Sequence, residues 1–138
     1  MPDNLAFVAD ETEVDDRDKV DGMMTNLARG RIALGLATLA APKLSAKLMG
    51  LGAADAGRDY MVRMFGAREV ALGAGYLLSD DGGRRLWARI GLAVDALDVA
   101  SGMKTRRGLP LWVTAGAVGI AGGAAGIGAA KVASDLLR

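Results

Sequence analysis

The longest stretch without a charged side chain runs from Leu109 to Ala130 and covers 22 residues. A helix rises about 1.5 Å per residue, so this stretch is about 33 Å long, enough to cross a hydrocarbon core of roughly 30 Å. Lys131 ends it. The segment therefore predicts a transmembrane helix, and the rest of the chain must fold around one.

The sequence after residue 24 divides into four helical stretches. We predict helices over 25–41, 58–79, 84–104 and 109–136, with no strand between them. Pro42 ends the first helix because proline removes a backbone hydrogen bond, and the Asp-Asp-Gly-Gly segment 80–83 supplies a turn. The predicted fold class is all-α, a four-helix transmembrane bundle whose chain enters and leaves on the same side.

A short segment after Pro42 places lysines and leucines on adjacent faces. Lys43 and Lys47 lie on one face of a helix, and Leu44 and Leu48 lie on the next. This pattern is typical of a short helix that lies in a membrane interface. An amphipathic turn on a soluble bundle would have the same pattern.

Charge is distributed unevenly along the chain. Residues 1–21 carry eight acidic residues against Arg17 and Lys19, although the formal net charge of the whole chain is +1. This acidic segment lacks the basic region and the long apolar region of a signal peptide. We divide the chain into an acidic N-terminal arm, 1–24, and a transmembrane bundle, 25–138. The arm is either simply solvated or docks on a basic partner.

The chain has neither cysteine nor histidine. Disulfides, zinc sites with Cys or His ligands, histidine-ligated haem and a Ser-His-Asp triad are therefore excluded. We assign no catalytic residue, no metal site and no cofactor. The basic residues are scattered among helix ends, so we expect no nucleic-acid partner.

Three of the predicted helices carry charges far from their ends. A lone central Arg or Asp costs roughly 2.5–3.5 kcal/mol on insertion scales, so these charges either face inward and pair or belong to a soluble bundle. Asp95 and Asp98 are three residues apart and share a helix face. Arg68 can bind a carboxylate with its planar fork. The predicted buried ion network consists of three basic and three acidic residues, Arg31, Arg63, Arg68, Glu69, Asp95 and Asp98.

Small and aromatic residues support the membrane interpretation. Small residues at a spacing of four let helix backbones approach closely in membranes. We assign this helix-packing role to Gly73, Gly91, Gly102, Gly119, Gly122, Gly123 and Gly126. In an up-down-up-down bundle, Tyr60 and Trp112 would lie at one membrane interface and Tyr76 and Trp87 at the other.

The segments "YMVRMFGAREVALGAGYLL" and "RRLWARIGLAVDALDVASG", followed by a small-residue helix, resemble the DoxX-like group of small four-pass bacterial membrane proteins. More narrowly, they are similar to an uncharacterised family in that group. The resemblance covers roughly residues 25–130 and rests on Arg68-Glu69 with Leu72-Gly73 and on Asp95 with Asp98. It implies a four-helix transmembrane bundle and, through some relatives, an accessory subunit of a quinone-linked oxidoreductase.

Three functions remain open. The first is a non-enzymatic accessory or interaction protein that binds membrane lipid, a partner membrane protein or a second copy of itself. The second is a small carrier or quinone-linked subunit that handles protons through Glu69, Asp95 and Asp98. The third is a soluble helical interaction module. For the membrane forms we expect the bacterial inner membrane with both termini cytoplasmic, because nine basic residues lie on that side and seven on the other.

Overall fold

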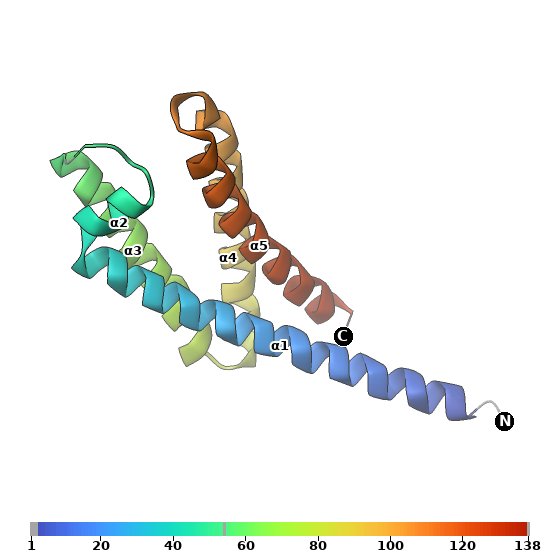
Figure 1. Ribbon diagram of the computed structural model, residues 1–138. Coiled ribbons are helices and arrows are strands. Elements are labelled where there is room, and N and C mark those ends of the chain that lie inside the picture. Colours follow the sequence, from blue (N-terminus) through green and yellow to red (C-terminus); the bar gives the residue numbers. More distant parts are fainter. Residues whose placement is uncertain (1–2, 54, 138) are drawn as a thin grey trace.

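The computed structural model describes residues 3–53 and 55–137, with side chains from Thr12 onward (Figure 1). The described chain is helical throughout and contains no strand, which confirms the all-α prediction. In chain order the elements are α1 (Asp3–Ala40), α2 (Pro42–Leu48), α3 (Ala56–Leu78), α4 (Asp81–Thr105), a single 3₁₀ turn (Arg106–Gly108) and α5 (Leu111–Leu136).

The helix boundaries follow from local chemistry. α1 ends at Ala40, and Pro42 begins α2, where its missing N–H is not needed. The Asp80 carboxylate accepts a hydrogen bond of 2.8 Å from the backbone N–H of Gly83 and caps α4. The Asp55 carboxylate caps α3 in the same way. The predicted break at Pro42 is confirmed, as is the separate short helix after it.

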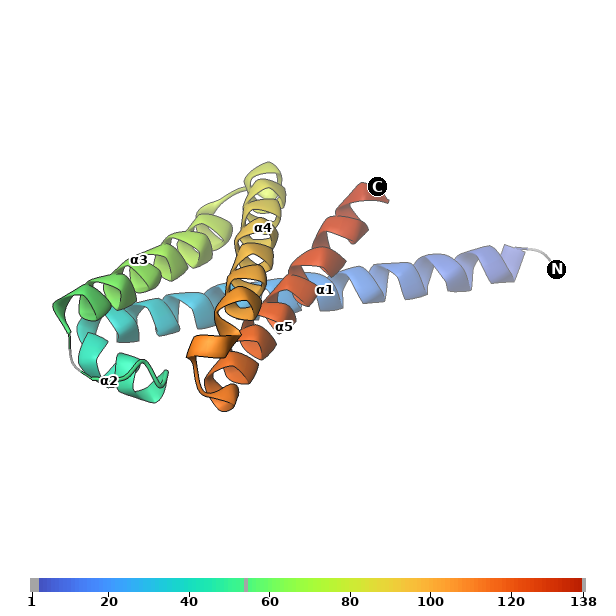
Figure 2. The ribbon, with the colours of Figure 1, turned by 90° about the horizontal axis from the view of Figure 1, so that it is seen from above.

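The first helix begins much earlier than the sequence predicts. α1 starts at Asp3 rather than near Thr25, so the boundary placed at 24/25 lies inside a continuous helix of 38 residues. Pairs four residues apart, Arg17 with Glu13 and Lys19 with Asp15, stabilise the acidic part as a helix. Figures 1 and 2 show this part of α1 extending beyond the other helices.

The helices form two antiparallel pairs. α1 packs mainly on α3, and α4 packs mainly on α5 (Figures 1 and 2). Glycines allow the close approach of α1 and α3. A Cβ added at Gly66 or Gly35 would overlap the backbone of the facing helix, and one at Gly73 would overlap the carbonyl oxygen of Ala28.

The two pairs also meet at the end where α2 and the α4–α5 connection lie. Gly50 has a φ of +68°, a conformation that favours glycine, and it lies against the side chains of Trp112 and Val113. A Cβ there would overlap both side chains. This contact joins the loop after α2 to the start of α5.

The glycines of α5 do not pack as predicted. Nothing lies within 4 Å of a Cβ placed at Gly119, Gly122, Gly123 or Gly126, because these residues face away from the other described helices. α5 packs on α4 through the opposite face, where Gly128 lies against Leu92. Gly102 of α4 lies against Val118. The small-residue pattern of α5 therefore marks its outer face.

One helix of the described chain is long and apolar enough to cross a membrane by length and composition, and this is α5. α1, α3 and α4 do not meet that criterion, since each contains more charged residues.

The glycine contacts predict a difference between two identical substitutions. Gly73→Ala forces α1 and α3 apart and should lower the free energy of unfolding by about 1–3 kcal/mol. Gly119→Ala adds a methyl group into open space and should leave stability unchanged or raise it by up to about 1 kcal/mol. Thermal unfolding of the purified variants measures both. Equal melting temperatures would contradict the α1–α3 contact.

Candidate functional site

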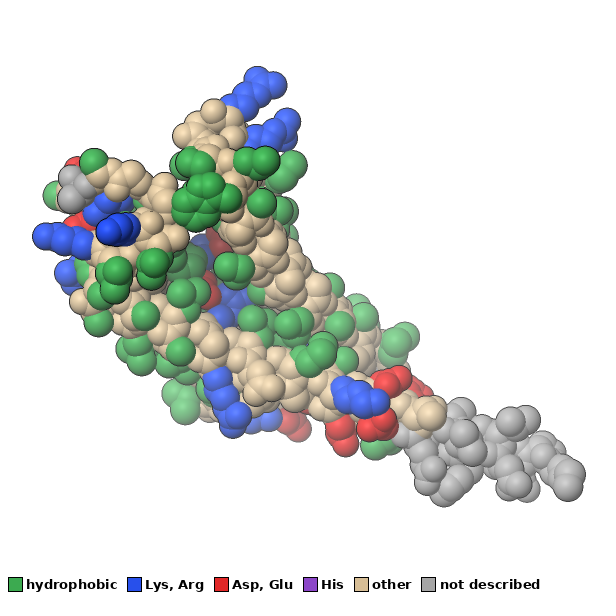
Figure 3. Space-filling model, viewed as in Figure 1, with side chains coloured by type: hydrophobic (Ala, Val, Ile, Leu, Met, Phe, Trp, Pro, Cys, Tyr) green, Lys and Arg blue, Asp and Glu red, His purple; other side chains and the backbone are tan. Residues whose placement is uncertain are grey.

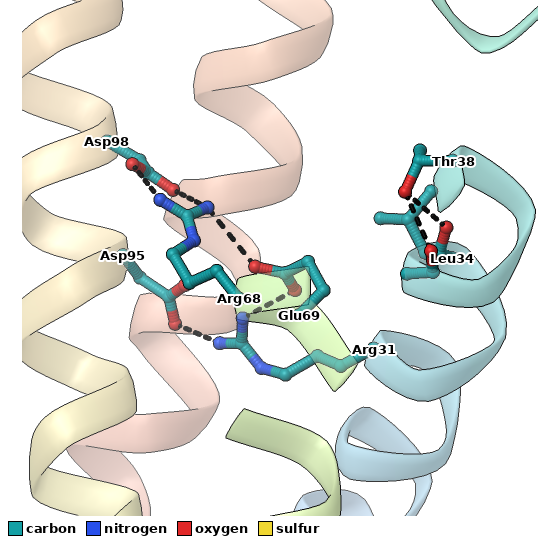
Figure 4. Close-up of polar contacts among 8 residues, drawn as sticks. Arg31, Leu34, Thr38, Arg68, Glu69, Asp95 and Asp98 are labelled. Carbon is teal, nitrogen blue, oxygen red and sulfur yellow. Dashed lines mark hydrogen bonds and ion pairs between the residues drawn. The ribbon is translucent and has the colours of Figure 1, made fainter. Parts of the chain in front are cut away.

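Five charged side chains from three helices form a continuous chain of ion pairs in the bundle (Figure 4). The Arg31 guanidinium of α1 donates to Glu69 Oε2 of α3 at 2.9 Å and to Asp95 Oδ2 of α4 at 2.5 Å. Arg68 donates to Glu69 Oε1 at 3.1 Å. It also donates hydrogen bonds to both carboxylate oxygens of Asp98, at 2.9 and 2.7 Å. The order of charges is Asp95, Arg31, Glu69, Arg68, Asp98.

The helix geometry explains why these residues meet. Asp95 and Asp98 are three residues apart on α4 and present their carboxylates to α1 and α3. Gly91 lies one turn before Asp95, and the Nη2 atom of Arg31 would lie 3.9 Å from a Cβ at that position. A methyl group at Gly91 would therefore be in ordinary van der Waals contact with Arg31, so Gly91 borders the network.

The two halves of the network differ in exposure. Arg31, Glu69 and Asp95 are buried. The Arg68 and Asp98 side chains are 33% and 34% exposed. Arg68 also lies 4.9 Å from the centre of the Phe65 ring. Figure 3 shows charged atoms at the floor of a hollow between the two helix pairs. The network is thus closed on one side and accessible on the other.

The network contains three carboxylates and two guanidinium groups, so it carries one surplus negative charge when every group is ionised. The sequence predicted a network of three basic and three acidic residues that included Arg63. The inclusion of Arg63 is wrong. Arg63 is exposed and forms none of these contacts. It precedes Arg68 by five residues, which places it about 140° away around α3.

The aromatic residues predicted for the two membrane interfaces differ in burial. Tyr60 and Trp112 are 63% and 61% exposed. Tyr76 is buried against Met24, Ala28 and Ala88, and Trp87 packs on the same cluster. Tyr76 and Trp87 therefore belong to the core, because the small residues around them leave space for a ring.

A second charged cluster was not predicted. The Lys131 ammonium of α5 lies 2.7 Å from Asp21 of α1 and 2.8 Å from Asp135. Lys131 and Asp135 are buried. Their spacing of four residues, directly after the uncharged stretch, is a signal that sequence reasoning could have used. Asp21 belongs to the segment assigned to a separate arm, so this contact required the tertiary structure.

The chemistry that these groups support is mutual neutralisation across helices. Each guanidinium contacts two carboxylates, and each carboxylate accepts from at least one arginine. Among the described residues no group of three or more acidic side chains is arranged to hold a metal ion. The network can hold α1, α3 and α4 together, and its surplus carboxylate can carry a proton.

Arg31 should be the most sensitive residue of the network. Arg31→Leu leaves Glu69 with one partner and Asp95 with none, and should lower the free energy of unfolding by about 3–5 kcal/mol. Arg29→Leu, at an exposed position on the same helix, is the matched control and should stay within about 0.5 kcal/mol of the wild type. Denaturation of both variants tests this. Similar stabilities would show that the ion pairs contribute little.

No family model, no curated protein and no solved structure matches this chain. The resemblance of the motifs in α3 and α4 to the DoxX-like group therefore stays a prediction. A functional assignment has to rest on the ion network and on the distribution of charge over the helices.

Proposed function

We propose that this chain is a small four-pass membrane protein with a non-enzymatic accessory or interaction role, which it performs by binding lipid or a partner protein. The observation that carries this proposal is that charged side chains lie in the core while many large apolar side chains lie on the surface. The described core contains Arg31, Glu69, Asp95, Lys131 and Asp135, all buried. Charged residues are almost never buried in soluble domains unless they are paired, as these are.

Large apolar side chains lie on the outside. They occur on each of the four long helices, in the middle of the helix as well as at its ends. Examples are Leu36 on α1, Met64 on α3, Leu97 on α4 and Ile120 on α5, which are 54%, 48%, 67% and 73% exposed. A hydrocarbon solvent stabilises such a surface, whereas water does not.

On α1, α3 and α4, exposed charges bracket a band of the outer surface that carries no other fully exposed charge; Arg68 and Asp98 lie within these intervals and are 33% and 34% exposed. On α1 the band extends from Arg29 to the end of the helix at Ala40, and Lys43 follows in α2. On α3 it extends from Arg63 to the end of the helix at Leu78, and Asp80 follows in the turn. On α4 it lies between Arg89 and Lys104. Within the helices, these intervals correspond to about 17–23 Å. These lengths are shorter than a hydrocarbon core of roughly 30 Å. Arginine and lysine side chains at such positions can extend toward the headgroups and so make up for the shorter length.

The interaction role is supported by the hollow between the helix pairs and by the outer face of α5. The Arg68–Asp98 pair, about one-third exposed, offers charged contacts to a partner. The open glycines of α5 offer a smooth helix face to lipid, to a partner helix or to a second copy of the chain. The resemblance to DoxX-like proteins agrees with this proposal.

Cysteine accessibility distinguishes four spans from one, because the natural chain has no cysteine. We expect the protein to stay in bacterial inner membranes after carbonate extraction. An impermeant thiol reagent applied to intact spheroplasts should label Lys47→Cys but not Gly82→Cys or Ser134→Cys, which lie on the cytoplasmic side in the proposed topology. These three positions lie in or near α2, at the start of α4 and near the end of α5.

Other labelling patterns correspond to other architectures. If only α5 spans the membrane, Gly82→Cys reacts like Lys47→Cys, and both differ from Ser134→Cys. If the orientation is reversed, Gly82→Cys and Ser134→Cys react and Lys47→Cys does not. Recovery of the chain in the soluble fraction would identify a soluble helical module and overturn the proposal.

The surplus carboxylate of the network favours proton handling as a second candidate function. A small cavity of about 20 Å³, lined by Arg31, Tyr76 and Asp95, lies on the side of the network away from Asp98. That volume is enough for about one water molecule. Reconstituted wild-type protein should then carry protons down an imposed pH gradient, and Asp95→Asn should abolish this flux. Equal rates in wild-type, Asp95→Asn and protein-free vesicles would exclude this function.

A further inference from the structure

A polar cavity of about 170 Å³ lies where α1, α3, α4 and α5 meet, beside the α3–α4 turn. Its volume is several times that of the smaller cavity, which has room for about one water molecule. Three basic and three acidic side chains line it, Arg84, Arg85, Lys131, Asp21, Asp81 and Asp135. The ion network described above contributes none of these residues.

The charges of the cavity are divided into two halves. In one half, the single ammonium of Lys131 contacts both Asp21 and Asp135, at 2.7 and 2.8 Å. This half therefore has a surplus of one negative charge. It can attract a second cation, and an amine would find carboxylate oxygens there.

The other half contains two arginines without a carboxylate partner among the described residues. Arg84 lies over the Tyr76 ring, 5.8 Å from its centre. The Nε atom of Arg85 is buried and has no hydrogen-bond acceptor. With Asp81 included, this half has a surplus of one positive charge. The surplus positive charge of this half can attract an anion, and the guanidinium groups can donate hydrogen bonds to it.

The position of the two arginines strengthens this argument. α4 begins at Asp81, so Arg84 and Arg85 lie close to its N-terminus. The helix dipole disfavours cations at that end and favours anions. Two unpaired arginines there are unfavourable by themselves and favourable beside a phosphate, which an arginine fork binds through two parallel hydrogen bonds.

We propose that this cavity binds the headgroup of an amine-bearing phospholipid such as phosphatidylethanolamine. Its phosphodiester, with one negative charge, lies between Arg84 and Arg85, and its ammonium faces Asp21 and Asp135. The two half-cavities carry the complementary charges. This inference rests on the proposed membrane location, because the ligand is part of the bilayer.

Native mass spectrometry of the full-length protein in neutral detergent tests the site. Phosphatidylethanolamine, phosphatidylglycerol and inorganic phosphate are titrated separately. We expect saturable binding of phosphatidylethanolamine to the wild type, weaker binding of phosphatidylglycerol and little binding of phosphate. The double variant Arg84→Gln/Arg85→Gln should bind phosphatidylethanolamine about tenfold or more weakly, since each arginine would contribute charged hydrogen bonds.

Arg89→Gln is the matched control, because Arg89 is an exposed arginine on the same helix that does not line the cavity. It should bind the lipid like the wild type. Without lipid, the double variant and Arg89→Gln should have similar melting temperatures, since neither Arg84 nor Arg85 forms an ion pair in the described structure. Failure of the double variant to fold would show an internal role for these arginines and overturn the proposal.

Three binding results would also overturn it. These are equal affinity for phosphatidylglycerol, equal affinity for inorganic phosphate, and undiminished lipid binding by the double variant. A chain recovered in the soluble fraction would refute the membrane location itself. An integral membrane protein whose lipid binding does not depend on Arg84 and Arg85 would refute this site alone.

Discussion

The arrangement of the helices depends on Arg31. Its guanidinium reaches from α1 to carboxylates on α3 and on α4, so one side chain connects the two helix pairs. The pairs contact each other less extensively than the helices within each pair do. A buried carboxylate without a partner is strongly unfavourable, and this fixes how far the pairs can separate or rotate.

Small residues inside the bundle follow from this constraint. Helix α1 can approach α3 closely, so that Arg31 reaches Glu69, because Gly35, Gly66 and Gly73 have no Cβ. Glycine, alanine and paired charges occupy much of the core, beside a few larger side chains such as Leu72 and Tyr76. Much of the apolar bulk therefore lies on the outer surface, where a lipid solvent would stabilise it.

The polar groups inside the bundle lie in sequence from one end toward the hollow. The Lys131 cluster lines the larger cavity, Tyr76 lines both cavities, and Arg31 and Asp95 line the smaller one. Beyond them, Arg68 and Asp98 form the partly exposed end of the network. Both charged clusters contain more carboxylates than cations. The interior thus contains a column of ionisable groups beneath an apolar exterior, and the proposed headgroup binding and the alternative of proton handling would both involve it.

Much of the secondary structure could be predicted because its causes are local. Pro42 must interrupt the helix that precedes it, Asp80 can cap the helix that follows it, and the spacing of Asp95 and Asp98 places them on one face. The requirement that the central charges pair also follows from the sequence, because unpaired charges are costly in any apolar environment. The start of α1 was missed, because ion pairs along the acidic segment stabilise a helix that its composition does not suggest.

The amino-acid sequence by itself determined the all-α class, the break before α2, the approximate extent of three of the long helices and the need for internal ion pairs. Only the tertiary structure decided that Arg31 is the central cation, that Arg63 stays outside, that Asp21 meets Lys131 and that the glycines of α5 face outward. The physical reason is that helical periodicity specifies which residues share a face of one helix. It does not specify how each helix is rotated or which helix that face meets, and these depend on how all the helices pack together.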